Sequence, residues 1–254
     1  MHNNHAEFTA ALAHHPITTT EPDGTPVYTC VIGGQISASR PHQPHLTIPF
    51  RVPVKVTGHL AEVFTRRAYR QGDVILLRGA LNYTATQRPG EPHRRSFITI
   101  EPDVMDLLIP AADAPLIHEG PYVRYAGGDN RVSLIGNVTR PALLRRTHAG
   151  DSVRTVPCAV NEIHHAPGLP TTRQLFVDIN VWRHLAEQTS GFQTSDRVAV
   201  CGPLLQDQWT GQDGQRRSVL RIEATQYQPL ISARTHAAEH TAHHRITFEY
   251  GAAQ

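Results

Sequence analysis

The sequence predicts an all-β protein made of two similar small β-domains in tandem. Short runs of alternating apolar and polar residues are interrupted by turns rich in Gly, Asp and Asn, which is typical of antiparallel strands. Three short motifs occur twice along the chain, in the same order. The 254 residues suffice for one large domain or two small ones. An internal duplication of one β-domain accounts for both observations.

The repeated motifs define the duplication. They are His59–Glu62 and His184–Glu187, Gly24–Val27 and Gly150–Val153, and Arg94–Ser96 and Arg216–Ser218. All three pairs lie roughly 122 to 126 residues apart, which indicates a duplicated unit rather than chance. We therefore expect a first domain over Ala6–Ile109 and a second over Asp129–Ile231, each near the common domain length.

Each repeat is expected to contain five strands and one short helix. In the first repeat we place the strands at Glu7–Ala13, Val27–Ile36, Thr47–Val56, Val74–Tyr83 and Ser96–Pro102. In the second we place them at Arg131–Thr139, Val153–Asn161, Leu175–Trp182, Arg197–Trp209 and Ser218–Gln226. The helix carries the His-Leu-Ala-Glu motif and follows the third strand. The turns Gln71–Asp73 and Thr194–Asp196 lead into the fourth.

Two segments lie outside the repeats. Pro110–Gly128 contains Pro, Ala and Gly and has little periodicity, so it is expected to be a linker. Residues 232–254 form a His-rich C-terminal extension. Both an ordered helix and strand and a loose extension fit this composition.

Composition limits the class of protein. The formal net charge is only +2, and the basic residues are almost all arginine, since Lys55 is the only lysine. Arginine suits planar contacts to phosphate and stacking on bases. Cys30, Cys158 and Cys201 lie in apolar runs and are expected to be buried free thiols, which suits a cytoplasmic protein. We find no secretory signal and no apolar run long enough to cross a membrane.

The strand Leu175–Trp182 carries the most informative local pattern. Side chains alternate along a strand, so the aliphatic residues at the odd-numbered positions share one face. The other face carries Phe176, Asp178, Asn180 and Trp182. Two aromatic rings among polar groups fit a surface on which bases stack, although packing against the helix or a dimer partner fits the same pattern.

The second repeat resembles the bacterial single-stranded-DNA-binding protein family, whose members have OB-folds. The motifs that carry this resemblance are Asn130–Arg140, Arg145–Val153, Cys158–Glu162, Val181–Glu187, Gly202–Leu204 and Trp209–Arg217. The resemblance implies two tandem five-stranded OB-fold barrels joined by a linker, as in the family branch with two folds per chain. It also implies that Phe176, Trp182 and Trp209 stack on bases.

Seven arginines near these aromatics would neutralise phosphates: Arg145, Arg146, Arg154, Arg183, Arg216, Arg217 and Arg221. The first repeat lacks this set. Arg51 stands opposite Phe176, Thr57 opposite Trp182 and Thr86 opposite Trp209, so the second repeat is expected to dominate DNA binding. The first repeat would bind DNA more weakly or serve mainly in assembly.

We expect a non-enzymatic protein without cofactor or metal that binds single-stranded DNA with little sequence preference and protects it during replication, recombination and repair. A homodimer with four OB-folds, located in the cytoplasm with the nucleoid, is expected. The alternatives are an OB-fold scaffold that binds replication proteins and a histidine-dependent metalloenzyme. DNA and RNA both fit a stacking surface. The chain ends Phe248–Gln254 without an acidic tip, so tip-dependent partners are not expected.

Overall fold

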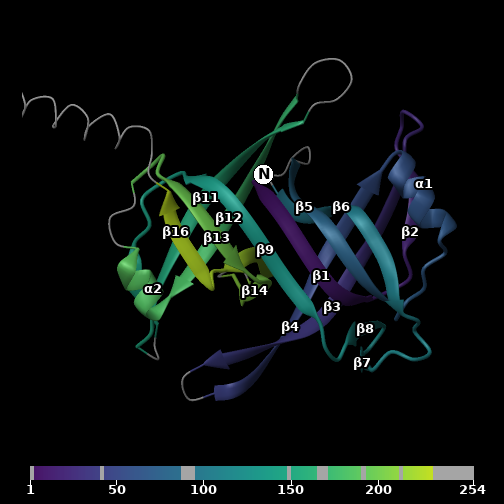
Figure 1. Ribbon diagram of the computed structural model, residues 1–254, viewed down its shortest axis with the longest axis horizontal. Helices are drawn as coiled ribbons and strands as arrows, with labels where there is room; N and C mark the ends of the chain where they lie inside the picture. Colours follow the sequence, from purple (N-terminus) through teal and green to yellow (C-terminus); the bar gives the residue numbers. More distant parts are fainter. Residues whose placement is uncertain are drawn as a thin grey trace, which may run out of the picture.

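The computed structural model describes residues 3–40, 43–86, 95–147, 150–164, 171–189, 193–211 and 214–230. Two β-barrels lie side by side, with the N-terminal strand between them (Figure 1). Almost all described elements are strands, so the all-β, two-barrel class expected from the sequence is confirmed. The C-terminal extension 232–254 lies outside the described residues.

The described residues of the first fold form six strands and one helix. They are β1 (Asn4–Leu12), β2 (Ile17–Thr20), β3 (Pro26–Arg40), β4 (Gln43–Thr57), α1 (His59–Arg66), β5 (Val74–Thr86) and β6 (Arg95–Ile109). Antiparallel pairing runs along β3 and β4 and along β5 and β6. A parallel pairing of Val54 with Ile100 joins β4 to β6 and closes the barrel.

The second fold repeats this order, with the counterparts of β5 and of β6 each divided in two. Its elements are β9 (Asp129–Val138), β10 (Leu144–Arg146), β11 (Ser152–His164), β12 (Thr171–Trp182), α2 (Arg183–Gln188), β13 (Arg197–Gly202), β14 (Leu204–Thr210), β15 (Arg216–Glu223) and β16 (Gln226–Leu230). A parallel pairing of β12 with β15, at Asp178 and Arg221, matches the closure of the first barrel.

The predicted single strand Arg197–Trp209 is therefore two strands. The break falls at Pro203, which has no backbone N–H to donate to a neighbouring strand. The carbonyl oxygen of Pro203 accepts a hydrogen bond from the backbone N–H of Glu223 at 2.9 Å. On either side of this break the chain changes partner, since β13 pairs with β9 and β16 whereas β14 pairs with β15.

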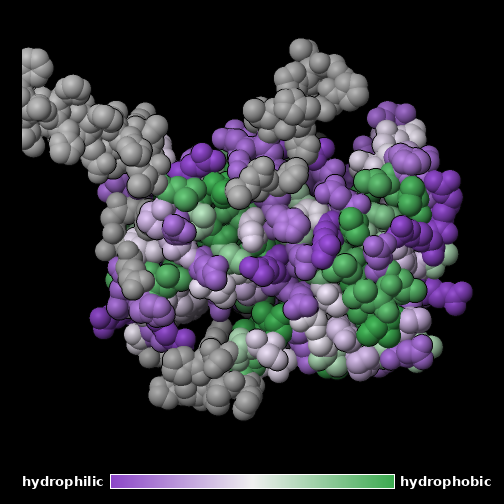
Figure 2. All heavy atoms as spheres, viewed as in Figure 1, coloured by the Kyte–Doolittle hydropathy of each residue, from purple (hydrophilic) through white to green (hydrophobic). Residues whose placement is uncertain are grey.

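Within the described part of the chain, the two folds are joined by one antiparallel strand pairing. β1 pairs with β9 from Asn4 opposite Leu134 to Thr9 opposite Asp129, so the barrels share a continuous sheet. Hydrophilic side chains run along the middle of this face, over β1 and β9 (Figure 2). Arg78 on β5 pairs with Glu7 on β1 at 2.7 Å.

The duplication extends to individual buried polar groups. The side-chain amide of Asn4 donates to the carbonyl of Leu81 at 2.8 Å and accepts from its backbone N–H at 3.0 Å. Asn130 makes the same two bonds to Leu204, both at 2.8 Å. Both asparagines are buried. Each therefore fixes the first strand of its fold to the fourth-strand region at the corresponding place.

A glycine lies close to each of these contacts. A Cβ atom built on Gly79 would lie 2.2 Å from the carbonyl oxygen of Glu101, and one built on Gly202 would lie 2.0 Å from that of Glu223. Such distances are far below van der Waals contact. Only glycine therefore allows the fourth strand to approach the fifth at this point in either fold.

The expected linker has its own structure. Residues Leu116–Glu119 (β7) and Tyr122–Tyr125 (β8) form an antiparallel hairpin. The backbone N–H of Val123 donates to the carbonyl of Ala13 at 3.0 Å, and the Val123 side chain is buried. The segment thus packs against the first fold, although its short strands gave no visible periodicity in the sequence.

Candidate nucleic-acid interface

The outer face of β12 has the expected alternation. Leu175, Val177, Ile179 and Val181 are buried, whereas Phe176 is 42% exposed on the opposite face. The Phe176 ring can therefore present an apolar surface to a ligand while its neighbours form the core. An exposed ring of this kind is the element on which OB-folds stack bases.

Phe176 lies where the two folds meet. Its ring contacts that of Tyr83 on β5, with 5.4 Å between the centroids and 72° between the planes. An edge-to-face contact of this kind is a favourable arrangement for two aromatic rings. The first fold thus helps to orient the ring of Phe176.

A groove lies between the folds at this contact. It has a volume of about 320 Å³ and is lined, among others, by Arg51, Tyr83 and Phe97 of the first fold and Phe176, Asp178 and Ser218 of the second. Phe97 on β6 is 51% exposed. The groove therefore combines apolar rings with a few polar groups, as ligand sites do.

Trp209 forms a second exposed aromatic site. It lies near the end of β14, is 46% exposed and stands opposite Arg217 in the β14–β15 ladder. Arg216, Arg217 and Ser218 line a hollow with it. Ser218 also lines the groove beside Phe176. The Trp209 hollow and the groove between the folds are therefore adjacent.

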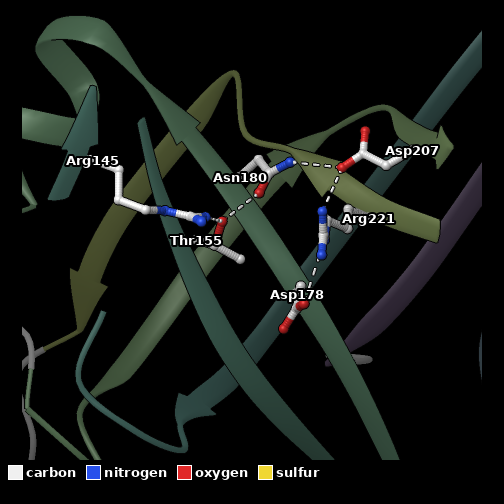
Figure 3. Close-up of polar contacts among 6 residues, drawn as sticks. All are labelled: Arg145, Thr155, Asp178, Asn180, Asp207 and Arg221. Atoms are coloured by element: carbon white, nitrogen blue, oxygen red, sulfur yellow. Dashed lines mark hydrogen bonds and ion pairs between the residues drawn. The ribbon is translucent and has the colours of Figure 1, made fainter. Parts of the chain in front are cut away.

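Arg221 lies between two carboxylates on the outer side of the second barrel. Its Nη1 donates to Oδ2 of Asp207 at 2.6 Å, and its Nε to Oδ2 of Asp178 at 3.4 Å (Figure 3). At neutral pH one guanidinium thus faces two acids. A phosphate that approaches Arg221 must compete with both of them.

This contact belongs to a longer polar network. Asn180 Nδ2 donates to Asp207 at 3.5 Å, and Thr155 Oγ1 donates to Oδ1 of Asn180 at 2.9 Å. Arg145 Nη2 donates to Thr155 Oγ1 at 3.0 Å (Figure 3). The network links Arg145 on β10 to Arg221 on β15 and fixes the side chains between them.

Trp182 and Arg183 lie in a different hollow. Trp182 is partly buried at the end of β12, and residues Ile36 and Ile48 of the first fold border the same hollow. The indole Nε1 is buried and has no hydrogen-bond partner among the described residues. Arg183 Nε pairs with Asp151 Oδ1 at 3.0 Å. Trp182 and Arg183 are therefore separate from the groove that Phe176 lines.

The remaining predicted arginines differ in their environment. Arg146 on β10 is exposed, as are Arg216 and Arg217 on β15. Arg154 is only 8% exposed, and its guanidinium donates to the backbone carbonyls of Ala142 and Ala186. Its geometry is that of a structural residue, since both bonds satisfy carbonyls inside the second fold.

Tyr83, Phe97 and Arg51 line the groove but are not among the residues that the sequence predicts for the site. A signal for Phe97 was present, because it alternates with the buried residues Ile98 and Ile100 in the same way that Phe176 alternates with its neighbours. That Tyr83 would meet Phe176 depends on the pairing of β1 with β9. No local pattern indicates that pairing.

The sequence predicts that the protein holds no metal ion and that its cysteines are buried free thiols. Among the described residues, no group of three His, Cys, Asp or Glu side chains is placed to hold a metal ion. Cys30 and Cys158 are buried free thiols, as expected, whereas Cys201 is a free thiol that is only partly buried. Burial raises the pKa of Cys30 and of Cys158 to about 12. Within the same part of the chain, no helix has the length and apolar character of a membrane span.

Fold and surface together define a tandem OB-fold protein with exposed aromatic residues where its two barrels meet. The model of the Single-strand binding protein family matches residues 129–230. The chain is 31% identical over 229 residues to the single-stranded DNA-binding protein of Deinococcus radiodurans, covering 89% of this chain and 75% of the relative. It is 30% identical to that of Thermus thermophilus, covering 84% and 79%. The chain belongs to the single-strand binding protein family.

The fold agrees with this assignment. A crystal structure of the wild-type single-stranded DNA binding protein from Thermus aquaticus superimposes with a TM-score of 0.71. That alignment covers 91% of this chain and 94% of the other, at 23% identity. It shows that the two-barrel architecture extends over nearly the whole described chain.

Proposed function

We propose that the protein binds single-stranded DNA without sequence preference by stacking bases on Phe176 and Trp209. The observation that carries this proposal is the exposure of both rings on adjacent sites of the second fold, joined through Ser218. The names of the relatives in Deinococcus and Thermus support it. Any base has an aromatic face, so stacking gives affinity without selecting a sequence.

The arginines supply the complementary charge. Arg145, Arg146, Arg216 and Arg217 are exposed around this surface and would neutralise phosphates. Arg221 would contribute only after it leaves its two carboxylates. Trp182 and Arg183 would contact a strand that extends toward α2, whereas Arg154 would support the fold. The proposal involves no chemical step and no cofactor.

The same proposal includes the biological setting. The protein would protect exposed strands during replication, recombination and repair, in the cytoplasm with the nucleoid, as a homodimer with four OB-folds. A hollow on the outer surface of the second fold, lined by Leu134, Ile135, Ala199 and Val200, offers an apolar surface away from Phe176 for the second chain. Light scattering should then give the mass of two chains.

The experiment is a titration of the full chain with fluorescein-labelled oligo-dT over a range of salt concentrations. We expect tight binding that weakens steeply with salt and is not competed by duplex DNA. Parallel titration with oligo-U compares RNA. Failure to bind either strand would contradict the proposal and favour the scaffold function, in which the OB-folds contact replication proteins.

A charge variant with a matched control sharpens this test. Arg216→Gln with Arg217→Gln should reduce the salt slope by about 1.4, since each phosphate contact to a single strand contributes about 0.7. The control is Arg66→Gln with Arg70→Gln, two exposed arginines at and after the end of α1, on the outer end of the first fold (Figure 1). The control should keep the wild-type slope.

A further inference from the structure

The groove between the folds contains exposed aromatic rings from both of them. Phe97 of β6 and Phe176 of β12 are each about half exposed, although both line the same groove. Covering an exposed ring removes apolar surface from water, which favours the binding of a ligand or partner there. The sequence alone assigned stacking residues only to the second fold, so the first-fold wall of this groove has no assigned role.

The contact between Tyr83 and Phe176 fixes the geometry of the groove. With 72° between the rings, the edge of one meets the face of the other. Despite this contact, Phe176 is 42% exposed. A ring that is held on one side and open on the other is preorganised to receive a planar group.

Charge is present on the first-fold wall as well. Arg51 lines the groove, and its Nη2 pairs with Oε2 of Glu119 at 2.6 Å. Its guanidinium also lies 4.8 Å from the ring centre of Tyr122. The hairpin β7–β8 therefore positions this cation at the groove. Glu119 also pairs with Arg124 at 3.0 Å, so two cations share one acid here, whereas Arg221 faces two acids. Arg51 can therefore contribute to neutralising a phosphate of a strand bound there.

We propose that Tyr83, Phe97 and Phe176 form one nucleotide-binding subsite that spans both folds. A strand would run from the Trp209 hollow past Ser218 into the groove, and from there onto the first fold beside Arg51. This inference rests on the proposed function. It makes the first fold a part of the binding surface in addition to a unit of assembly.

The test compares Phe97→Ala with Leu108→Ala in the full chain. Both residues lie on β6 and are half exposed, at 51% and 50%, but only Phe97 lines the groove. Phe97→Ala should weaken binding to a labelled dT oligonucleotide about five- to thirty-fold, whereas Leu108→Ala should leave it unchanged. Thermal unfolding confirms that both variants fold.

A double-mutant cycle tests whether the rings act on one nucleotide. If Phe97 and Phe176 share a subsite, their effects on affinity should not be independent. The factor by which Phe97→Ala lowers the affinity should be about threefold smaller in the Phe176→Ala background than in the wild type. The fold-losses of affinity caused by Phe97→Ala and by Trp209→Ala should simply multiply in the double variant, because Trp209 lies in the adjacent hollow.

The outcomes separate this inference from the proposed function. If Trp209→Ala weakens binding while Phe97→Ala behaves like Leu108→Ala, the shared subsite is wrong and the function stands. Independent effects of Phe97→Ala and Phe176→Ala would also overturn the single subsite. If the wild-type chain does not bind the oligonucleotide, the proposed function itself is overturned.

Discussion

Arg221 is held by Asp207, with 2.6 Å between Nη1 and Oδ2. The pair lies on the surface where the sequence predicts that arginine neutralises phosphate. Asp178 contacts the same guanidinium at 3.4 Å, so the local charge is one positive against two negative groups. The acids therefore oppose the approach of a polyanion and reduce what Arg221 contributes to binding.

Asp207→Asn should tighten binding to oligo-dT. The substitution removes one negative charge and weakens the hold on Arg221, which can then reach a phosphate. We expect an affinity about three- to tenfold higher at low salt, with the salt slope steeper by about 0.7. Fluorescence anisotropy over a salt series measures both quantities.

Asp106→Asn is the matched control for this prediction. Asp106 pairs with Arg67 at 2.8 Å in the first fold, and neither residue lines the groove or the Trp209 hollow. Its affinity and salt slope should equal those of the wild type. Equal gains in the two variants would show that the general loss of negative charge, rather than the release of Arg221, explains the effect.

Much of the fold could be predicted because its signals are local. Alternation along Leu175–Trp182 indicates which side chains form the core, and the repeated His-Leu-Ala-Glu motif indicates the duplication. Each of these patterns depends only on neighbouring residues and on one strand or helix. The helices α1 and α2 begin at His59 and Arg183, within one residue of the repeated motif.

What could not be predicted depends on contacts between distant segments. Tyr83 contacts Phe176 across the two folds that the β1–β9 pairing joins, and the buried Arg154 donates hydrogen bonds to carbonyls of two other segments. A charged residue in an amphipathic strand fits a surface site and a buried structural site equally well. The sequence therefore identifies the second-fold aromatics but not the groove to which the first fold contributes.

Trp209 should account for the change in intrinsic fluorescence when DNA binds. The two tryptophans differ in environment, since Trp209 is exposed and the indole nitrogen of Trp182 is buried. In Trp182→Phe, which retains Trp209, oligo-dT should quench fluorescence strongly. In Trp209→Phe, which retains Trp182, quenching should be weak. Stronger quenching of Trp182 would show that the strand passes over α2 instead.

Trp209→Ala should also weaken binding, because base stacking on an aromatic side chain contributes about 1–3 kcal/mol. The exposed position of the ring means that the fold should tolerate this change. Anisotropy with the same oligo-dT gives the affinity, and urea unfolding gives the stability. A loss of stability that matches the loss of binding would argue against direct stacking.

Alkaline pH should destabilise the folded protein through its buried thiols. Burial raises the pKa of Cys30 and of Cys158 from about 9 in the unfolded chain to about 12. Above pH 9 the unfolded chain therefore releases these protons first, and the free energy of unfolding falls as pH rises toward 12. Urea unfolding at about pH 8, 9.5 and 10.5 measures this slope, because these values bracket the thiol pKa of the unfolded chain.

The variant Cys30→Val with Cys158→Val is the comparison for the thiol prediction. It lacks both titrating groups, so its stability should depend less on pH over the same range than that of the wild type. The buried hydroxyl of Tyr28, whose pKa is raised by burial, is present in both proteins and cancels in the difference. Parallel slopes for the two proteins would contradict the prediction.

Asn130→Ala should be among the most damaging substitutions of a polar residue. The change removes both partners of Leu204 and leaves a buried N–H and a buried carbonyl without hydrogen bonds. Each unsatisfied group costs about 1–3 kcal/mol, so a total loss of about 2–6 kcal/mol in the free energy of unfolding is expected. Asn4→Ala should cost a similar amount through Leu81, since the two contacts repeat each other.

The exposed Asn161 on β11 supplies the control, and Asn161→Ala should change stability by less than about 0.5 kcal/mol. Urea unfolding of the three variants measures these costs, and a loss at Asn4 or Asn130 no larger than that at Asn161 would show that water replaces the missing amide.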